Sequence, residues 1–272
     1  MIHPTVIVNK QAKLAEGVEI GPYSIVGENV SIGAHAKIKE RVFLENTELG
    51  KNCKIFSGAV IGSIPQDLKF KGEKSLVKIG DNNIIREYVT INRGTAANGE
   101  TTIGSDNLIM AYSHIAHDCR IGNGVIIANA GTLAGHVNIE DKAVIGGLVA
   151  IHQFVRIGEL SIIGGCSKVI KDIPPYALVD GHPAKIYGIN SVGLRRKNFS
   201  SDLIAQLKKA FKILFFSPLS LAEGLERVKK EVVLSSEVLH LIEFVKNSQR
   251  GIAKGQSPRT QPPSRETGKL II

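Results

Sequence analysis

Residues suited to proton transfer are concentrated between positions 114 and 153. Histidine has an unperturbed pKa of about 6.5, so at neutral pH it can accept a proton and release it again. His117 is followed directly by Asp118, whose carboxylate could orient the ring and stabilise its cation. Gly135 has no side chain to obstruct its backbone N–H, as an oxyanion-binding group requires. Together these residues predict general-base catalysis by His117.

Four more polar residues could line the same site. They are His114, His136, His152 and Gln153. Two other interpretations stay open. A single polar residue at a corner of a repeat protein is commonly exposed and without function, and three histidines can bind zinc through ring nitrogens at about 2.0–2.1 Å. Because general-base catalysis suits the arrangement better, we expect no metal here.

These residues lie within a six-residue repeat. Every sixth residue from Ile103 to Val169 is aliphatic, which gives twelve matches without an exception. Neither the helical period near 3.6 nor the strand period of 2 produces this pattern. A hexapeptide period is typical of a parallel β-helix, in which each hexad forms one short strand and one tight corner. We therefore expect a mainly β fold.

The same repeat begins at Ile2 and includes 26 aliphatic positions, with breaks at residues 63–78 and 92–101. We interpret the breaks as loops that leave the β-helix, and loops on a rigid scaffold commonly carry function. Three hexads per turn give a triangular coil of 18 residues, with between eight and nine turns stacked about 4.8 Å apart. Residues 117, 135 and 153 should then lie above one another.

The last third of the chain has a different pattern. We expect the β-helix to span residues 1–187, a small C-terminal α-helical domain to span 188–250, and the tail 251–272 to be disordered. The tail is rich in Gly, Pro, Ser, Gln and charged residues, a composition that buries little apolar surface.

Helix signals support this division. Ser200 or Ser201 is a suitable N-cap for the first amphipathic stretch, and Ser220 with Glu223 forms a capping-box pattern before the second. A third helix is expected over residues 236–245.

The net charge of +9 comes mostly from this helical region and the tail. Fifteen of the 34 Lys and Arg residues lie after residue 189, but only seven of the 25 Asp and Glu residues do. Aromatic residues are not interleaved with the basic ones, so we expect no nucleic acid partner. A basic face for an acidic protein or a phosphorylated ligand is the better interpretation.

Cysteine usage and the apolar runs indicate the compartment. Cys53 and Cys119 fall on small inward positions of the repeat, and with Cys166 they form no CxxC motif, so we expect core thiols in a reducing environment. The N-terminus lacks signal-peptide features, and no stretch approaches the roughly 18 apolar residues of a membrane span. A cytoplasmic protein without a transmembrane segment is therefore expected.

Seven motifs give the chain a family resemblance. They are HIAHDC (114–119), LAGH (133–136), VDGHPA (179–184), QDLKFKGE (66–73), IREYVTINRGT (85–95), HQFVRIG (152–158) and GGCS (164–167). Over about residues 1–250 the chain closely resembles the UDP-N-acetylglucosamine acyltransferases of lipid A biosynthesis. The resemblance implies a left-handed β-helix and a homotrimer with active sites in the clefts between subunits.

The resemblance also implies a reaction, the first step of lipid A biosynthesis. His117 would remove the proton from the 3-hydroxyl of UDP-N-acetylglucosamine, with Asp118 in support, and the N–H of Gly135 would stabilise the oxyanion. The hydroxyl would attack the thioester of a 3-hydroxyacyl chain held on the phosphopantetheine of acyl carrier protein, so no cofactor of the enzyme itself is implied. The acidic carrier protein would be the partner of the basic helical domain.

Further matching positions are implied to hold the substrates. They are Asp67 and Lys69 for the sugar, His114, His136, His152 and Gln153 for the nucleotide-sugar cleft, Asn190 and Arg196 for the uridine and phosphates, and Gly165 for the end of the acyl groove. This chain departs from the family at GHPA (181–184), because the family has a variant of this motif with the histidine one place later. A role for His182 is therefore not supported.

Three rival functions are left. The later N-acyltransferase of the same pathway resembles this chain in base and acyl donor, but it normally carries an extra N-terminal domain, whereas here the repeat begins at Ile2. A zinc lyase and a purely structural solenoid are the other two. Whether the acceptor is the sugar 3-hydroxyl or its 3-amino analogue is open at this point.

Overall fold

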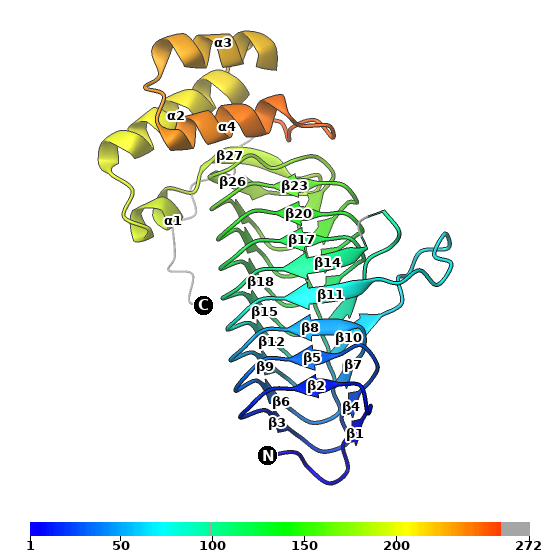
Figure 1. Ribbon diagram of the computed structural model, residues 1–272. Helices are drawn as coiled ribbons and strands as arrows, with labels where there is room; N and C mark the ends of the chain where they lie inside the picture. The colour runs from blue at the N-terminus through cyan, green and yellow to red at the C-terminus, as the bar shows by residue number, and fades with distance from the viewer. Residues whose placement is uncertain (98, 257–272) are drawn as a thin grey trace.

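Three parallel sheets form the walls of a triangular prism, around which the chain winds as a left-handed β-helix (Figure 1). The computed structural model describes residues 1–97 and 99–256. Most strands have only two residues, and in almost all of these the second residue is buried and the first is not. Neighbouring side chains of a strand point to opposite faces, so the repeated aliphatic residues line the interior. The expected fold class is confirmed.

The strands are named here by sheet. The first sheet contains β1 (Ile7–Val8), β4 (Ile25–Val26), β7 (Phe43–Leu44), β10 (Val60–Ser63), β13 (Thr90–Asn92), β16 (His114–Ile115), β19 (Thr132–Leu133), β22 (Ala150–Ile151) and β25 (Lys168–Val169). The second sheet contains β2 (Lys13–Leu14), β5 (Ser31–Ile32), β8 (Thr47–Leu49), β11 (Leu76–Ile79), β14 (Glu100–Ile103), β17 (Arg120–Ile121), β20 (Asn138–Ile139) and β23 (Arg156–Ile157). The third sheet contains β3 (Glu19–Ile20), β6 (Lys37–Ile38), β9 (Lys54–Ile55), β12 (Ile84–Ile85), β15 (Leu108–Ile109), β18 (Ile126–Ile127), β21 (Val144–Ile145), β24 (Ile162–Ile163), β26 (Ala177–Asp180) and β27 (Lys185–Ile189).

The strand register confirms the winding of 18 residues in the upper part of the prism. Ile115 pairs with Leu133, Leu133 with Ile151, and Ile151 with Val169. None of these four side chains is more than 3% exposed. Burial of each contributes about 1.5–3 kcal/mol to stability. The residues that follow these strands therefore occupy one edge of the prism in adjacent turns.

We name the three edges by the sheets that they join. The first corner joins the first sheet to the second, the second corner joins the second to the third, and the third corner joins the third to the first. Most corners contain a residue with positive φ, as at Asp118 (59°), His136 (62°) and Phe154 (63°) of the first corner. This conformation is uncommon for residues with side chains, and asparagine, aspartate and histidine adopt it most readily.

The cysteines lie where the repeat predicts. Cys53 and Cys119 are buried, whereas Cys166 is exposed at the third corner. Burial raises the pKa of the Cys119 thiol to about 12. A thiol with so high a pKa is almost entirely protonated at neutral pH, so the interpretation of Cys119 as a core residue is confirmed.

Both breaks in the repeat are loops, and both leave the prism at the first corner (Figure 1). The first loop (residues 64–75) connects β10 to β11, and the second loop (described at residues 93–97 and 99) connects β13 to β14. The loops are shorter than the breaks at 63–78 and 92–101. The last residues of the first break belong to β11, and those of the second break belong to β14. Both strands continue the second sheet, in which β11 pairs with β8 on one side and β14 on the other.

The last turn is closed by a hairpin and four helices. Strands β26 and β27 pair antiparallel, so the β-structure continues to Ile189, two residues beyond the boundary expected at 187. The helices are α1 (Ser191–Arg196), α2 (Ser201–Phe215), α3 (Leu221–Glu231) and α4 (Ser236–Lys246). No helix among the described residues is long and apolar enough to cross a membrane.

The helix signals in the sequence are mostly confirmed. The side chain of Ser200 accepts a hydrogen bond from the Leu203 N–H, and Ser220 with Glu223 forms the capping box at α3. Helix α1 was not expected, because six residues carry too short a periodic pattern to recognise. It begins at the N-cap Asn190, whose side chain accepts from the Gly193 N–H.

The expectation of disorder after residue 250 is wrong for residues 251–256. Ile252 is 6% exposed and bridges to Asp172, and Gly255 bridges to Ile186. These contacts add a short segment to the end of the prism, and their partners lie about 70 to 80 residues earlier in the chain, so composition could not indicate them. The remainder of the expected tail, residues 257–272, lies outside the described residues.

Polar contacts fix the helical domain to the second sheet. The Nε2 atom of His240 on α4 lies 2.8 Å from Oε2 of Glu140, just after β20. The guanidinium of Arg156 on β23 lies 4.2 Å from the ring centroid of Phe244 on α4. The hydrogen bond to Glu140 raises the pKa of His240 more than burial lowers it.

We predict that Leu133→Ala lowers the free energy of unfolding by about 2–5 kcal/mol, because the rigid turns above and below cannot collapse onto the cavity. Thr132→Ala is the matched control, since Thr132 is exposed on the same strand. Its effect should stay within about 0.5 kcal/mol. Urea denaturation followed by circular dichroism measures both, and similar losses in the two variants would contradict the stacked core.

A second prediction concerns the pH dependence of stability. The folded-state pKa of His240 is raised, so its contribution is fully present below the unfolded pKa of about 6.5 and is lost as the pH rises through the folded value. We therefore expect His240→Gln to lower the Tm more at pH 6 than at pH 8. Differential scanning calorimetry at both pH values tests this, and a pH-independent difference would exclude the ion pair as its source.

Candidate active site

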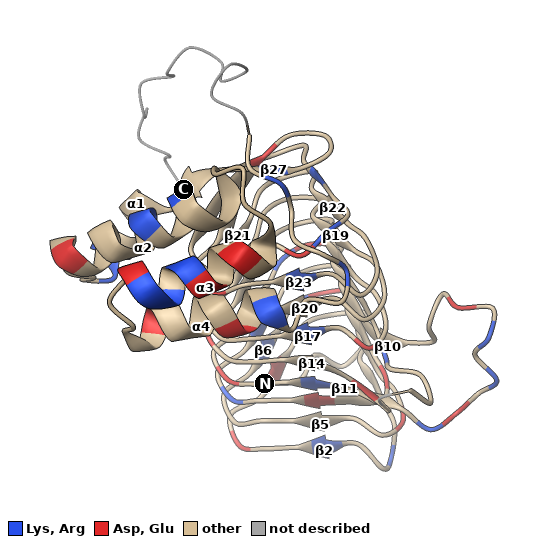
Figure 2. Cartoon of the chain, turned by 90° about the horizontal axis from the view of Figure 1, so that it is seen from above, with Lys and Arg blue, Asp and Glu red and all other residues tan. Residues whose placement is uncertain are grey.

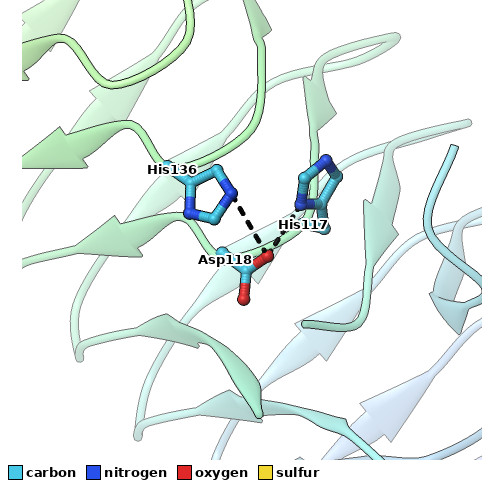
Figure 3. A group of neighbouring side chains, drawn as sticks. All are labelled: His117, Asp118 and His136. Carbon is cyan, nitrogen blue, oxygen red and sulfur yellow. Dashed lines mark hydrogen bonds and ion pairs between the residues drawn. The ribbon is translucent and has the colours of Figure 1, made fainter. Parts of the chain in front are cut away.

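The first corner brings the predicted catalytic residues together. His117 and Asp118 follow β16, and Gly135 and His136 follow β19 one turn higher. In Figure 3 the imidazoles of His117 and His136 lie on either side of the Asp118 carboxylate. The stacking of adjacent turns therefore makes one cluster from residues 18 positions apart.

His117 and Asp118 form a hydrogen-bonded pair. The distance between His117 Nδ1 and Asp118 Oδ2 is 2.7 Å, and the Asp118 side chain has no exposed surface. Thr95 also donates to this carboxylate, from its backbone N–H at 3.0 Å and from its hydroxyl at 2.7 Å. Burial alone would raise the pKa of Asp118, but the hydrogen bonds from His117 and Thr95 outweigh it and the pKa lies below its usual value.

The ionised carboxylate determines which ring nitrogen of His117 can act as a base. An ionised carboxylate only accepts hydrogen bonds, so Nδ1 of His117 must carry the hydrogen that is donated to Asp118. In the neutral ring, Nε2 then holds the free electron pair. Asp118 thereby orients His117 and directs its basic nitrogen away from the pair.

Gly135 lies directly against this ring. A Cβ atom added at Gly135 would lie 2.6 Å from Cε1 and 2.7 Å from Nε2 of His117, closer than real Cβ contacts. Any side chain would therefore displace the imidazole. Within the described residues, the N–H of Gly135 donates to no other group. It is available beside Nε2, as an oxyanion donor must be.

His136 completes the cluster and is supported by an aromatic residue. Its Nε2 lies 3.7 Å from Asp118 Oδ2, and its ring stacks on Phe154 with 4.5 Å between centroids. Burial lowers the pKa of His136, although the nearby Asp118 carboxylate opposes this. Burial therefore favours the neutral form of His136. Phe154 was missed in the sequence analysis, although its position 18 residues after His136 would have indicated the contact.

His114 lies on β16, just before the pair, and His152 lies at the same corner higher in the prism. His114 Nδ1 lies 2.7 Å from the Thr90 hydroxyl, and burial lowers the pKa of His114. His152 and Gln153 are exposed at the same corner one turn above Gly135, with His152 Nδ1 3.2 Å from the Gln153 carbonyl oxygen. Both are placed to contact a ligand that lies along the corner.

The first loop brings two further predicted residues to this corner. Asp67 is close enough for its charge to act on the pKa of His136, in the raising direction. Its side chain accepts a hydrogen bond from the Lys69 N–H at 2.9 Å, and the Lys69 side chain is exposed. The loop is held in part by Phe70, whose ring lies 5.4 Å from the Arg93 guanidinium of the second loop.

Three predicted residues lie at the other two corners of the same chain. Asn190 donates from its side chain to the Leu160 carbonyl oxygen at the second corner and caps α1, which ends with the exposed Arg196. Gly165 lies at the third corner, where an added Cβ would be 3.3 Å from the Gly147 oxygen. A single chain therefore does not unite these residues with His117. His182 is exposed in the turn between β26 and β27.

The cluster has the donor types of a metal site, since His117, Asp118 and His136 could each offer one ligand atom. Two ligands bound to zinc at 2.0–2.1 Å in a tetrahedral shell lie about 3.3 Å apart. The 2.7 Å separation of His117 Nδ1 and Asp118 Oδ2 is instead that of a charge-assisted hydrogen bond. Because Asp118 also accepts two hydrogen bonds from Thr95, the arrangement suits proton transfer.

Three family models match parts of the chain. A family model described as UDP-N-acetylglucosamine O-acyltransferase, domain 2, matches residues 172–253. A bacterial transferase hexapeptide model matches residues 100–134, and a model of a GMPPB C-terminal domain matches residues 2–97.

Similar proteins extend over nearly the whole chain. The acyl-[acyl-carrier-protein]–UDP-N-acetylglucosamine O-acyltransferase of Thermodesulfovibrio yellowstonii is 54% identical over 93% of this chain and 99% of its own length. The UDP-N-acetylglucosamine acyltransferase of Bacteroides fragilis has a TM-score of 0.92 at 45% identity, over 93% of this chain and 100% of its own. The corresponding structure from Acinetobacter baumannii gives 0.91 at 43%, over 93% and 99%. The chain therefore belongs to the UDP-N-acetylglucosamine O-acyltransferase family and is an acyltransferase.

Proposed function

We propose that the protein transfers an acyl chain from acyl carrier protein to the 3-hydroxyl of UDP-N-acetylglucosamine, the first step of lipid A biosynthesis. The observation that carries this proposal is the hydrogen-bonded pair of His117 and Asp118, with Gly135 against the His117 ring. The names of the similar proteins supply the two substrates.

The geometry accounts for each step of the reaction. His117 Nε2 removes the proton of the sugar hydroxyl while the hydroxyl oxygen attacks the thioester carbonyl carbon. The carbonyl oxygen becomes an anion and accepts a hydrogen bond from the Gly135 N–H. When the tetrahedral intermediate collapses, the C–S bond breaks, and His117 returns its proton to the departing thiolate. The ester and the free carrier thiol are the products.

Asp118 contributes to this sequence through His117. Its carboxylate holds Nδ1–H and stabilises the imidazolium that exists between the two proton transfers. We propose Asp67, Lys69, His114, His136, His152 and Gln153 as contacts of the nucleotide sugar, because the first loop, strand β16 and the first corner that follows it carry them. The proposed reaction uses no cofactor of the enzyme, since the acyl group is activated as a thioester on the carrier's phosphopantetheine.

The helical domain provides a basic surface for the acidic carrier protein. Figure 2 shows Lys and Arg residues along the helices, with acidic residues among them on α3. On α3 the charges partly neutralise one another, because Arg227 pairs with Glu231 and Lys229 with Glu226. Eight exposed cations of this domain form no ion pair within the described part of the chain. They are Arg195, Arg196, Lys197, Lys208, Lys209, Lys212, Lys230 and Lys246.

We propose a homotrimer because the candidate residues are divided among three corners. The catalytic pair, Asn190 with Arg196, and Gly165 can form one site only if other copies supply the missing edges. The third corner offers a suitable contact surface, where the exposed rings of Tyr88 and Tyr112 stack at 5.4 Å. A cytoplasmic location is proposed from the reduced, buried thiols of the prism.

A prediction tests the general base. His117→Ala should lower kcat about 10²- to 10⁴-fold, because the variant lacks the proposed general base. The measurement is acyl transfer from acyl carrier protein loaded with mixed acyl chains to UDP-N-acetylglucosamine or to its 3-amino analogue, read by mass spectrometry. Circular dichroism serves as the control for folding. Activity within a few-fold of the wild type would remove His117 from the mechanism, and a product only from the 3-amino sugar would favour the N-acyl reaction.

A further prediction concerns Gly165. Its proposed place at the end of the acyl groove means that Gly165→Met should shorten the preferred acyl chain by filling that space. An added Cβ would need only a small shift of the Gly147 backbone, so the fold should persist. The chain-length distribution of the product from mixed donors is the readout. An unchanged distribution in a folded variant would refute the assignment.

A further inference from the structure

The second loop makes its main polar contact with the candidate site through one residue. Thr95 is 9% exposed, and both its backbone N–H and its hydroxyl donate to the Asp118 carboxylate. The N–H binds Oδ1, and the hydroxyl binds Oδ2, the same oxygen that accepts from His117 Nδ1. Thr95 therefore donates a hydrogen bond to each oxygen of the Asp118 carboxylate, which orients His117.

The Thr95 hydroxyl is the donor in its hydrogen bond to Asp118. The Ala97 N–H donates to Thr95 Oγ1 at 3.3 Å, which uses the hydroxyl as an acceptor. The ionised Asp118 has no hydrogen to give, so the Thr95 hydroxyl must donate to it. The Gly99 N–H donates to the Thr95 carbonyl oxygen at 2.7 Å, which closes the loop around this residue.

The second loop is itself anchored to the first loop and the sheets. The Asn92 side chain donates to the Ile64 carbonyl oxygen at 3.0 Å, and the Arg93 N–H donates to Ser63. The Gly94 N–H donates to the Leu76 carbonyl oxygen at 3.4 Å. Thr95 thus reaches Asp118 from a backbone that is fixed on both sides, and its hydroxyl can hold the carboxylate in one orientation.

We infer that Thr95 is a positioning residue for the acyl transfer, which acts by holding the Asp118 carboxylate in the orientation that directs His117. The inference rests on the proposed function, since it assigns Thr95 to the same reaction. Among the described residues, Thr95 forms no hydrogen bond with His117 or Gly135, so its effect must pass through Asp118.

Thr101 offers a matched comparison within the same site. Its hydroxyl accepts a hydrogen bond from the Asp118 backbone N–H at 2.9 Å, and the residue is fully buried. Thr95 and Thr101 therefore both contact Asp118 through a threonine hydroxyl, but only Thr95 touches the carboxylate. A change at Thr101 affects the fold of the corner without removing a donor from the carboxylate.

The experiment measures kcat/KM against pH for Thr95→Val, Thr95→Ser and Thr101→Val. Valine keeps the shape and the backbone N–H but removes the hydroxyl donor, and kcat/KM should fall on the order of ten-fold. Loss of the Thr95 hydrogen bond to the ionised carboxylate raises the pKa of Asp118. The more basic carboxylate then stabilises the protonated form of His117, with which it is paired. The acidic limb of the profile should therefore move to higher pH, by about half a unit or more.

Thr95→Ser keeps the donor and should restore both the rate and the profile. Thr101→Val should lower the Tm while leaving the acidic limb in place. Thr95→Ala replaces Thr95→Val if the valine variant does not fold. An unmoved limb in a folded variant that lacks the hydroxyl, or a serine variant that fails to recover, would overturn the inference. Failure of the proposed function would give a different result from failure of this inference. In that case the wild-type protein would form no ester, or the His117→Ala variant would stay active.

Discussion

The parallel stacking of very short strands is the constraint on which the rest of the structure depends. Each turn contributes three short strands, and each strand places one aliphatic side chain inside the prism. Backbone hydrogen bonds between turns fix the vertical spacing at about 4.8 Å. A residue at a corner therefore has neighbours above and below at a defined distance, whatever its own side chain is. His117, Gly135 and Gln153 become neighbours for this reason alone.

The chemistry is concentrated at the one corner where the regular winding is interrupted. Both loops leave the prism there, and the second loop returns a threonine to the Asp118 carboxylate. Burial of a carboxylate is costly unless hydrogen bonds compensate for it. Here the donors are His117 and Thr95, and they keep the group ionised. The same contacts that make the buried charge tolerable also determine which nitrogen of His117 is basic.

The rigidity of the prism also limits what one chain can do. Its three corners are held apart by the filled core, so residues on different corners cannot converge by bending. Asn190 is engaged in capping α1 and in binding Leu160 at the second corner, and Gly165 lies at the third. The proposal of a homotrimer depends on the family resemblance, which assigns these separated residues to one site.

Much of this protein could be predicted from its sequence, because the repeat is local. Counting six residues at a time located the strands, and counting 18 placed His117, Asp118, Gly135 and His136 together. The caps at Ser200 and Ser220 depend on residues three positions away and were equally visible. Only the tertiary structure decided the contact of Thr95 with Asp118, the short helix α1, and the packing of residues 251–256 against the prism. These features depend on the paths of loops and on partners far away in the chain, which no local period encodes.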